Sequence, residues 1–252
     1  MKGSLPVMNN KAFCQGSLFS NFLSTHTKAI AVIVCSFIIS QSGLAQNNNA
    51  KDKEAAYIQT ITQRSNKIVA TLSITDSSKF YRVQNILVQQ YSSINTLHEG
   101  YNTQVKTIKK DSTLDKKTAS EKIAAVEAER TSAVGQLHKT FLSKLTTELN
   151  DDQITKIKDG MTYNKVAVTY NAYVAMIPSL TEEQKKKIYG YLVEAREYAM
   201  DAESADKKTE WFGKYKGRIN NYLSAQGYDV KKEGQEWEKR IKEAKEKKDS
   251  AA

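Results

Sequence analysis

Cysteine and proline are scarce in this sequence, and each scarcity excludes a class of structure. The two cysteines are Cys14 and Cys35, and the two prolines are Pro6 and Pro178. Residues 46–252 therefore contain no cysteine, which excludes disulfides, thiolate metal sites and cysteine nucleophiles from that part of the chain. A single proline in the same part favours helices, because proline breaks helix interiors.

The beginning of the chain has the three zones of a secretory signal. Residues 1–28 contain three lysines and no acidic residue, residues 29–39 are almost entirely apolar, and small residues then lead to Ala45. The apolar run is shorter than the roughly 20 residues that a membrane-spanning helix needs. We expect residues 1–45 to be a cleaved signal peptide, with an uncleaved anchor as the alternative. Residues 46–252 would then be exported to the periplasm or cell surface, with no stable membrane span.

The charge of the exported part is moderately basic. Loss of the three N-terminal lysines would lower the formal net charge from +10 to +7. A basic exported protein suits an anionic surface or polymer, such as an acidic oligo- or polysaccharide, and export argues against nucleic acid. A solvated basic face without a specific partner is the simpler explanation of the same charge.

The first half of the exported part has the spacing of long amphipathic helices. Apolar residues recur every three or four positions along residues 80–108, and a second such stripe covers residues 123–149. The polar stretch 110–117 between them is typical of a turn, so the two helices form an antiparallel hairpin. A weaker helix precedes them over residues 58–72. Together these elements predict a helical bundle over residues 52–149.

The second half, residues 150–247, is rich in aromatic residues. Nine of the thirteen tyrosines lie between Tyr163 and Tyr228, among segments with helical spacing. Residues 161–177 are ambiguous, since their apolar residues first alternate as in a strand and then step as in a helix. There we expect an extended piece leading into a short helix that ends before Pro178.

These patterns predict an all-α fold. A long N-terminal helical hairpin or bundle is packed on, or followed by, a smaller aromatic-rich helical half, and residues 46–252 form a single region. Residues 248–252 are expected to be a frayed tail.

Two short segments share one helix-start pattern. Residues 149–153 read LNDDQ and residues 180–184 read LTEEQ. Asn150 and Thr181 can cap their helices while the glutamines three residues later reach back, which makes a capping box. The pattern also resembles the L-T-x-x-Q signature of small helical periplasmic chaperones, which are cradle-like helical dimers that shelter unfolded clients. Capping alone explains it equally well.

The segment 210–223, EWFGKYKGRINNYL, is the best candidate for a binding site. On a helix, its aromatic and basic residues share a stripe beside the buried one, and two glycines leave room for a ligand or another helix. Aromatic faces stack on sugar rings, while arginine and asparagine bind hydroxyls or a carboxylate. A helix–helix interface is the alternative. The predicted binding residues are Trp211, Lys214, Tyr215, Arg218, Asn221 and Tyr222, with Arg196 reaching the same cleft.

No catalytic, cofactor or metal site is predicted. Glu194, Glu197 and Asp201 lie along one helix surface, and nothing in the sequence supplies the carboxylate that a glycosidase needs across the scissile bond. His98 and His138 are expected to be surface or seam residues. Phosphate-binding loops and hydrolase motifs are absent from the sequence.

The C-terminal residues carry a family resemblance. The run AREYAMDAESADKKTEWFGKYKGRINNYLSAQGYDV and the upstream MIPSLTEEQKKKI resemble a family of secreted bacterial proteins of uncharacterised function, strongest over residues 160–237. That family has been proposed to bind sugars, and its members are associated with polysaccharide utilisation. The resemblance implies a saccharide-associated exported protein. A periplasmic helical chaperone or adaptor and an uncharacterised carbohydrate-active enzyme, such as a lyase with a tyrosine base, are the alternatives.

Overall fold

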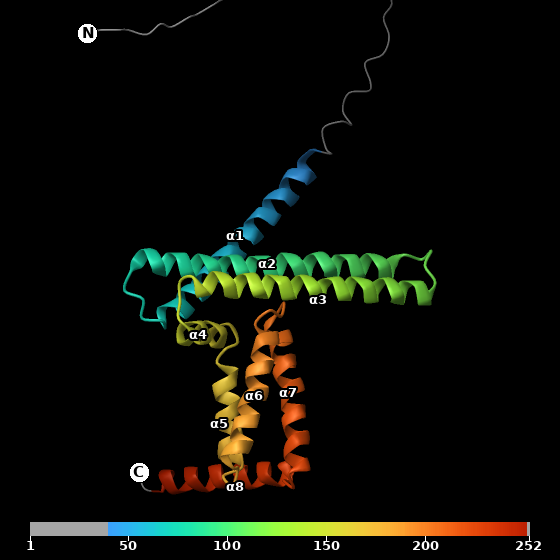
Figure 1. Cartoon of the computed structure of the whole chain (residues 1–252). Helices are drawn as coiled ribbons and strands as arrows, with labels where there is room; N and C mark the ends of the chain where they lie inside the picture. The colour runs from blue at the N-terminus through green and yellow to red at the C-terminus, as the bar shows by residue number, and fades with distance from the viewer. Residues whose placement is uncertain (1–39, 251–252) are drawn as a thin grey trace, which may run out of the picture. The chain divides into compact units, whose positions relative to one another are not determined.

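The computed structural model describes residues 40–250 as helices joined by short turns (Figure 1). The chain divides into two units, Met1–Asn49 and Ala50–Ala252, and only residues 40–49 of the first are described. Both cysteines and most of the expected signal peptide therefore lie outside the described residues. The helices are α1 (Ser40–Ala70), α2 (Ser77–Lys110), α3 (Lys116–Thr146), α4 (Asp151–Met161), α5 (Lys165–Met176), α6 (Glu182–Ala199), α7 (Ala205–Ala225) and α8 (Val230–Asp249).

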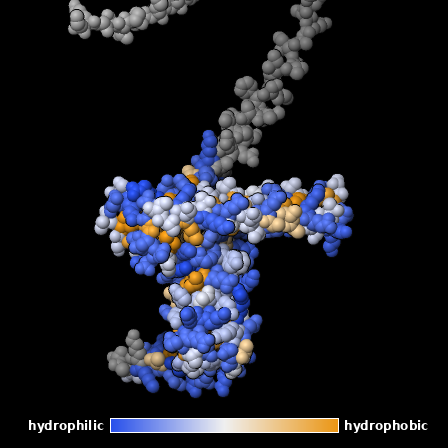
Figure 2. Space-filling view, in the orientation of Figure 1, coloured by the Kyte–Doolittle hydropathy of each residue, from blue (hydrophilic) through white to orange (hydrophobic). Residues whose placement is uncertain are grey.

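The predicted all-α class is confirmed, because residues 40–250 contain helices and turns and no strand. None of the helices in this range is both long and apolar enough to cross a membrane. Figure 2 shows hydrophilic residues over most of the visible face, interrupted by smaller hydrophobic patches.

The predicted hairpin is formed by α2 and α3, which run side by side (Figure 1). Asp76 caps α2 by accepting hydrogen bonds from the backbone N–H groups of Ser78 at 2.8 Å and Lys79 at 3.3 Å. Asp115 caps α3 in the same way, accepting from Thr118 N at 2.8 Å. The polar segment between the helices is a turn, as its composition predicts.

The first hydrophobic core lies among α1, α2, α3 and α4. Its fully buried side chains come from all four helices, and each contributes about 1.5–3 kcal/mol to folding. At Gly160 in α4, a Cβ atom would lie only 2.9 Å from the side chain of Ile68 in α1, so glycine permits the close approach of the two helices. Because α4 belongs to this core, the core extends past residue 149 to Met161. Members of the core include Ile61, Val69, Val83, Leu87, Phe141, Leu145, Ile157 and Met161.

The ambiguous segment 161–177 is helical where we expected an extended piece. Tyr163 and Asn164 both adopt φ 58°, the left-handed conformation, and turn the chain between α4 and α5. From Lys165 the chain is helical again and stops before Pro178, as predicted. The alternation of apolar residues wrongly indicates a strand. Val168 is 64% exposed, whereas Tyr173 and Ile177 are buried at helical spacing.

The second hydrophobic core lies among α5, α6 and α7. Its buried members include Ile188, Leu192, Phe212, Ile219 and Leu223. The capping boxes at Asn150 and Thr181 are both present, at the starts of α4 and α6. Gly227, at φ 90°, follows the end of α7 in the left-handed conformation typical of a helix C-terminus, and α8 then packs on α5.

Arg240 fixes α8 to α5. Its Nη2 donates to the carbonyl oxygens of Ala175 at 3.1 Å and Met176 at 2.9 Å, which are free at the end of α5. A cation placed on the terminal carbonyls of a helix also meets the negative end of the helix dipole.

Candidate functional site

The predicted aromatic stripe of α7 faces a matching stripe on α6. Tyr198 stacks on Trp211 with ring centroids 4.7 Å apart and an interplanar angle of 16°. Tyr191 meets Tyr222 edge to face at 6.2 Å. Both arrangements are favourable aromatic geometries. The helix–helix interface considered as the alternative therefore exists, and part of the stripe is used in it.

Tyr215 lies inside this interface and is only 2% exposed. Burial raises the pKa of its hydroxyl, and the nearby Glu194 carboxylate adds to the shift. The Arg218 guanidinium lies 4.7 Å from the centre of the Tyr215 ring. A ring covered in this way offers no face to a sugar, so the stacking role that we expected for Tyr215 has no support in the structure.

Arg218 and Tyr222 lie farther along α7, away from Trp211. Arg218 Nη1 donates to Glu194 Oε1 at 3.3 Å, and its guanidinium lies 5.1 Å from the centre of the Tyr191 ring. Tyr222, Tyr191 and Glu194 line a shallow groove of about 600 Å³ along α6 and α7. Asn221 is exposed.

Arg196 does not reach the aromatic stripe. It is 5% exposed, and its Nη1 donates to Asp159 Oδ1 at 2.8 Å. Its Nη2 donates to Glu197 Oε1 at 3.2 Å. Arg196 therefore joins α4 to α6 and orients Glu197, rather than contributing directly to a ligand as we expected.

A larger cleft, of about 840 Å³, lies between α3 and the turn that joins α6 to α7. Trp211 is the one predicted binding residue among the residues that line it. Lys214 is close by, with its ammonium 4.9 Å from the centre of the Trp211 ring. The lining also includes His98, Arg130, His138, Lys139, Glu197, Tyr198, Asp201, Glu203 and Lys207.

A hydrogen-bonded histidine and carboxylate form one wall of this cleft. His138 Nδ1 lies 2.5 Å from Asp201 Oδ2, and Asp201 is 5% exposed. Gln90 Nε2 donates to the other carboxylate oxygen of Asp201 at 3.2 Å. The hydrogen bond to Asp201 raises the pKa of His138, and Glu197, whose Oε2 is 3.7 Å from His138 Nε2, adds to the shift.

His98 holds the backbone of the same turn. Its Nε2 lies 2.9 Å from the carbonyl oxygen of Asp201, which can only accept, so this nitrogen carries the proton. The two histidines of the described chain, one from α2 and one from α3, thus both bind Asp201. Their expected role as seam residues is correct in part, since they join helices, but His138 is also a cleft residue.

The carboxylates of the cleft are already bound within the protein. Glu197 accepts a hydrogen bond from Lys158 Nζ at 2.7 Å, and Glu203 accepts one from Asn102 Nδ2 at 2.8 Å. Asp201 is bound to His138, so of the three carboxylates only Glu203, whose donor Asn102 is uncharged, has no cationic hydrogen-bond partner among the described residues.

The cations of the cleft lie at its rim. Lys139 is exposed and forms no ion pair within residues 51–250. Arg130 and Lys207 pair only with neighbours on their own helices, Glu127 and Glu210. The Lys207 pair is exposed and the Arg130 pair partly exposed; pairs of this kind contribute little, so all three cations can meet an anionic ligand.

No group of three or more metal-binding side chains comes together among the described residues.

The cleft offers an aromatic pair, a cationic rim and an imidazole with carboxylates at both nitrogens. Tyr198, His138 and Asp201 are not among the predicted binding residues, because the contacts that bring them to the cleft join α3, α6 and α7. The only signal in the sequence was the placement of Tyr198 and Asp201 on the carboxylate-rich stretch after Glu194.

Comparison with known proteins gives a family and no characterised relative. No curated protein matches the chain. Residues 58–243 match a family model described as "Protein of unknown function (DUF3826)", and this match includes all of α2–α7 and every residue of the cleft. The chain therefore belongs to the DUF3826 family.

Proposed function

We propose that the cleft between α3 and the α6–α7 turn binds an acidic saccharide. The observation that carries the proposal is the stacked pair of Tyr198 and Trp211 beside a rim of three cations. Tyr198 is 50% exposed, so part of its ring is accessible to a ligand.

Each part of the cleft suits one part of such a ligand. The apolar face of a sugar ring packs on aromatic rings, and an arginine binds a carboxylate through two parallel hydrogen bonds. Arg130 and Lys139 supply the charge, while Glu197 and Asp201 are already bound by Lys158 and His138. The proposal agrees with the sugar-binding role suggested by the C-terminal resemblance and with the export expected from residues 1–45.

The proposal is one of binding, and no residue is assigned a catalytic role. His138 has a carboxylate at each ring nitrogen, which favours the imidazolium and removes the free basic nitrogen that a general base requires.

Calorimetry tests the site with oligogalacturonides and neutral gluco-oligosaccharides of equal length. We expect the acidic ligand to bind more tightly, and Trp211→Ala and Lys139→Ala to weaken its binding about tenfold, the effect of losing a contact of about 1.4 kcal/mol. Tyr81→Ala, which removes an exposed tyrosine of α2 outside the cleft, is the matched control. Equal affinity for the two ligands, or unchanged binding by both cleft variants, would contradict the proposal.

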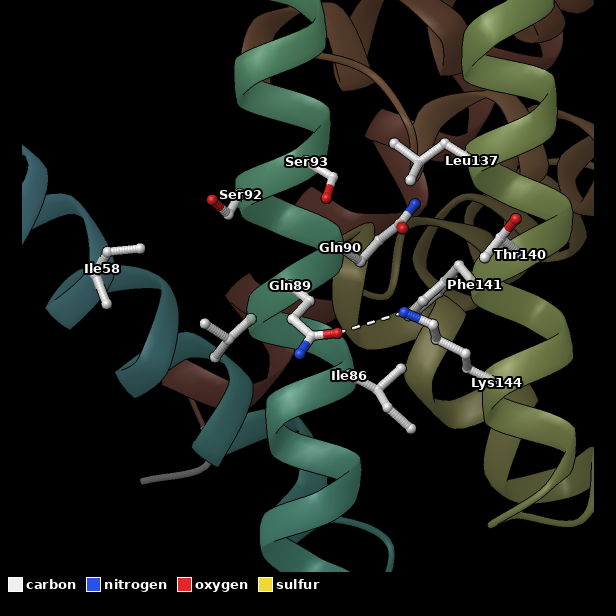
Figure 3. Close-up of a pocket in the computed structure, with 11 residues that line it drawn as sticks. Ile58, Ile86, Gln89, Gln90, Ser92, Ser93, Leu137, Thr140, Phe141 and Lys144 are labelled. Carbon is white, nitrogen blue, oxygen red and sulfur yellow. Dashed lines mark hydrogen bonds between the residues drawn. The ribbon is translucent and has the colours of Figure 1, made fainter.

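A second cavity favours the chaperone alternative. It measures about 380 Å³, lies where α1, α2 and α3 meet, and is lined partly by Ile58, Ile86 and Phe141 (Figure 3). Lys144 Nζ donates to Gln89 Oε1 at 3.4 Å across α2 and α3. The apolar part of this mixed lining, which also includes Gln90 and Ser93, could hold a hydrophobic client segment.

The chaperone alternative predicts that the protein suppresses client aggregation in a light-scattering assay and that Ile86→Ser abolishes the effect. Suppression that survives this substitution would place client binding elsewhere. Indifference to saccharides together with loss in Ile86→Ser would favour this function over saccharide binding.

A further inference from the structure

A small pocket lies where α1, α2 and the beginning of α7 meet. Its volume is about 90 Å³, and its polar lining includes Tyr57, Arg64, Tyr91, Asn95 and Lys208. It is separate from the saccharide cleft, although Ala202 and Glu203 line both.

Two cations line this pocket without an ionic partner. Lys208 is 4% exposed, and its Nζ donates to the carbonyl oxygens of Ala199 at 3.0 Å and Met200 at 2.8 Å. An ammonium has three donors, so one remains. Neither Lys208 nor Arg64 forms an ion pair with any carboxylate of residues 51–250.

Two cations face one carboxylate, Glu203, in the lining of the pocket, so its positive charge is only partly compensated from within the protein. Burial lowers the pKa of Lys208 to about 8; Asp201 opposes this shift, and the charge of Arg64 adds to it. Asp201 is bound to His138, and Glu203, the one carboxylate in the lining, keeps its charge because its donor Asn102 is uncharged; one positive charge is left over. A buried ammonium next to a second cation is costly unless an anion joins them.

Two further features of the pocket favour an anion. Tyr91 is 6% exposed, and its buried hydroxyl has Arg64 as a charged neighbour but donates to no acceptor among the described residues. The first residues of α7 form part of the lining, so the positive end of that helix dipole is directed at the pocket. A buried hydroxyl that donates to no acceptor is rare in native proteins and indicates a missing acceptor.

We infer that this pocket binds a small oxyanion, with Lys208, Arg64 and the Tyr91 hydroxyl donating to its oxygens. The volume of about 90 Å³ exceeds the roughly 10–15 Å³ that a single water molecule needs in the same measure. A group of the size of phosphate, sulfate or a carboxylate fits that space. The inference does not depend on saccharide binding in the cleft.

Binding there would also stabilise the turn after α6. Lys208 holds the carbonyl oxygens of Ala199 and Met200, and Asp201 follows directly. An anion that neutralises Lys208 removes the cost of burying its charge and so favours the conformation in which Asp201 meets His138.

The test uses the full chain at pH 7 in sodium phosphate, sulfate or acetate, with sodium chloride at equal ionic strength as the reference. We expect at least one oxyanion to raise Tm saturably above the chloride value and to bind one site by calorimetry. Arg64→Gln, at an exposed residue, and Tyr91→Phe, which keeps the ring, should each weaken that binding about tenfold or more, as expected for lost charge-assisted or buried hydrogen bonds.

Lys67→Gln provides the matched control, because it removes an exposed cation of the same helix outside the pocket. It should bind the oxyanion as the wild type does. The three salts distinguish inorganic phosphate and sulfate from a carboxylate ligand. If Tm were the same in all three salts and in chloride, the pocket would hold only water. If both pocket variants bound the oxyanion with unchanged affinity, the anion would bind elsewhere. Either result overturns the inference.

Discussion

His138 Nδ1 lies 2.5 Å from Asp201 Oδ2, and this contact joins the long α2–α3 hairpin to the turn that follows α6. His98 reinforces it by bonding the backbone oxygen of Asp201 at 2.9 Å. Two helices that are far from residue 201 in sequence thus fix one buried carboxylate, and that carboxylate positions the wall of the proposed saccharide cleft.

This pair predicts a pH dependence of stability. Asp201, and to a smaller degree Glu197, raises the pKa of His138 above its ordinary value of 6.5. A histidine whose pKa is raised by folding contributes stability that is fully present below pH 6.5 and is lost as the pH rises through the folded-state pKa. Urea unfolding of wild type and His138→Gln, from below pH 6.5 upward, measures the effect. The difference between their free energies of unfolding should become smaller as the pH rises.

Lys139→Gln is the control for that series, since it changes the exposed neighbouring residue on the same helix and leaves His138 and Asp201 in place. It should keep the wild-type pH profile. A His138→Gln variant with the same profile as the wild type would show that the pair does not hold in solution.

Lys208 predicts a pH dependence of the opposite sign. Its pKa is lowered by burial from 10.5 to about 8, so between these values the unfolded chain binds the proton that the folded chain has lost. Stability therefore rises with pH in this window, by at most about 3 kcal/mol. Lys208→Met should lack the rise, and urea unfolding between pH 8 and 10 measures it. A rise that persists in the variant would have to come from another group.

Gly160→Ala should destabilise the first core. The added Cβ would lie 2.9 Å from two carbon atoms of Ile68, so α1 and α4 would have to separate, at a cost of about 1–3 kcal/mol. Gly135→Ala, in α3, meets no atom within 4 Å and should instead stabilise the protein by about 0.5–1 kcal/mol, since alanine favours helix. Thermal unfolding of both variants gives the comparison, and a neutral Gly160→Ala would contradict the close approach.

Thr181→Ala should remove the cap of α6. The Thr181 hydroxyl accepts from Gln184 N at 3.2 Å, and Gln184 Oε1 accepts from Thr181 N at 3.0 Å. Losing a cap of this kind costs about 1 kcal/mol. Thr209→Ala, inside α7 and exposed, should change stability by no more than a few tenths in either direction. Equal effects of the two substitutions in chemical denaturation would show that the cap contributes nothing.

The helices and their ends follow from local rules, which is why the sequence predicts them. Spacing of three and four marks the hairpin, and the caps at Asn150 and Thr181 need only residues within one turn. The segment before Pro178 was misjudged because Val166 and Val168 alternate, while the actual reversal depends on the left-handed Tyr163 and Asn164.

The candidate site could be predicted only in part, because it depends on contacts between distant segments. The α7 stripe with Trp211 is visible in the sequence, yet nothing local tells which of its aromatic residues becomes covered. Tyr215 is buried by α6, while Tyr198, which had not been considered, is exposed beside Trp211. The pairing of His138 with Asp201 spans 63 residues and has no local signature.

Met200 gives the two hydrophobic cores a common boundary. It is fully buried in the first core, while Ala199, its neighbour in sequence, belongs to the second. Unfolding of either core would displace this boundary and expose apolar surface of the other core. Unfolding of one core therefore destabilises the other. The helical part of the chain should therefore unfold as one cooperative unit, in a single calorimetric transition.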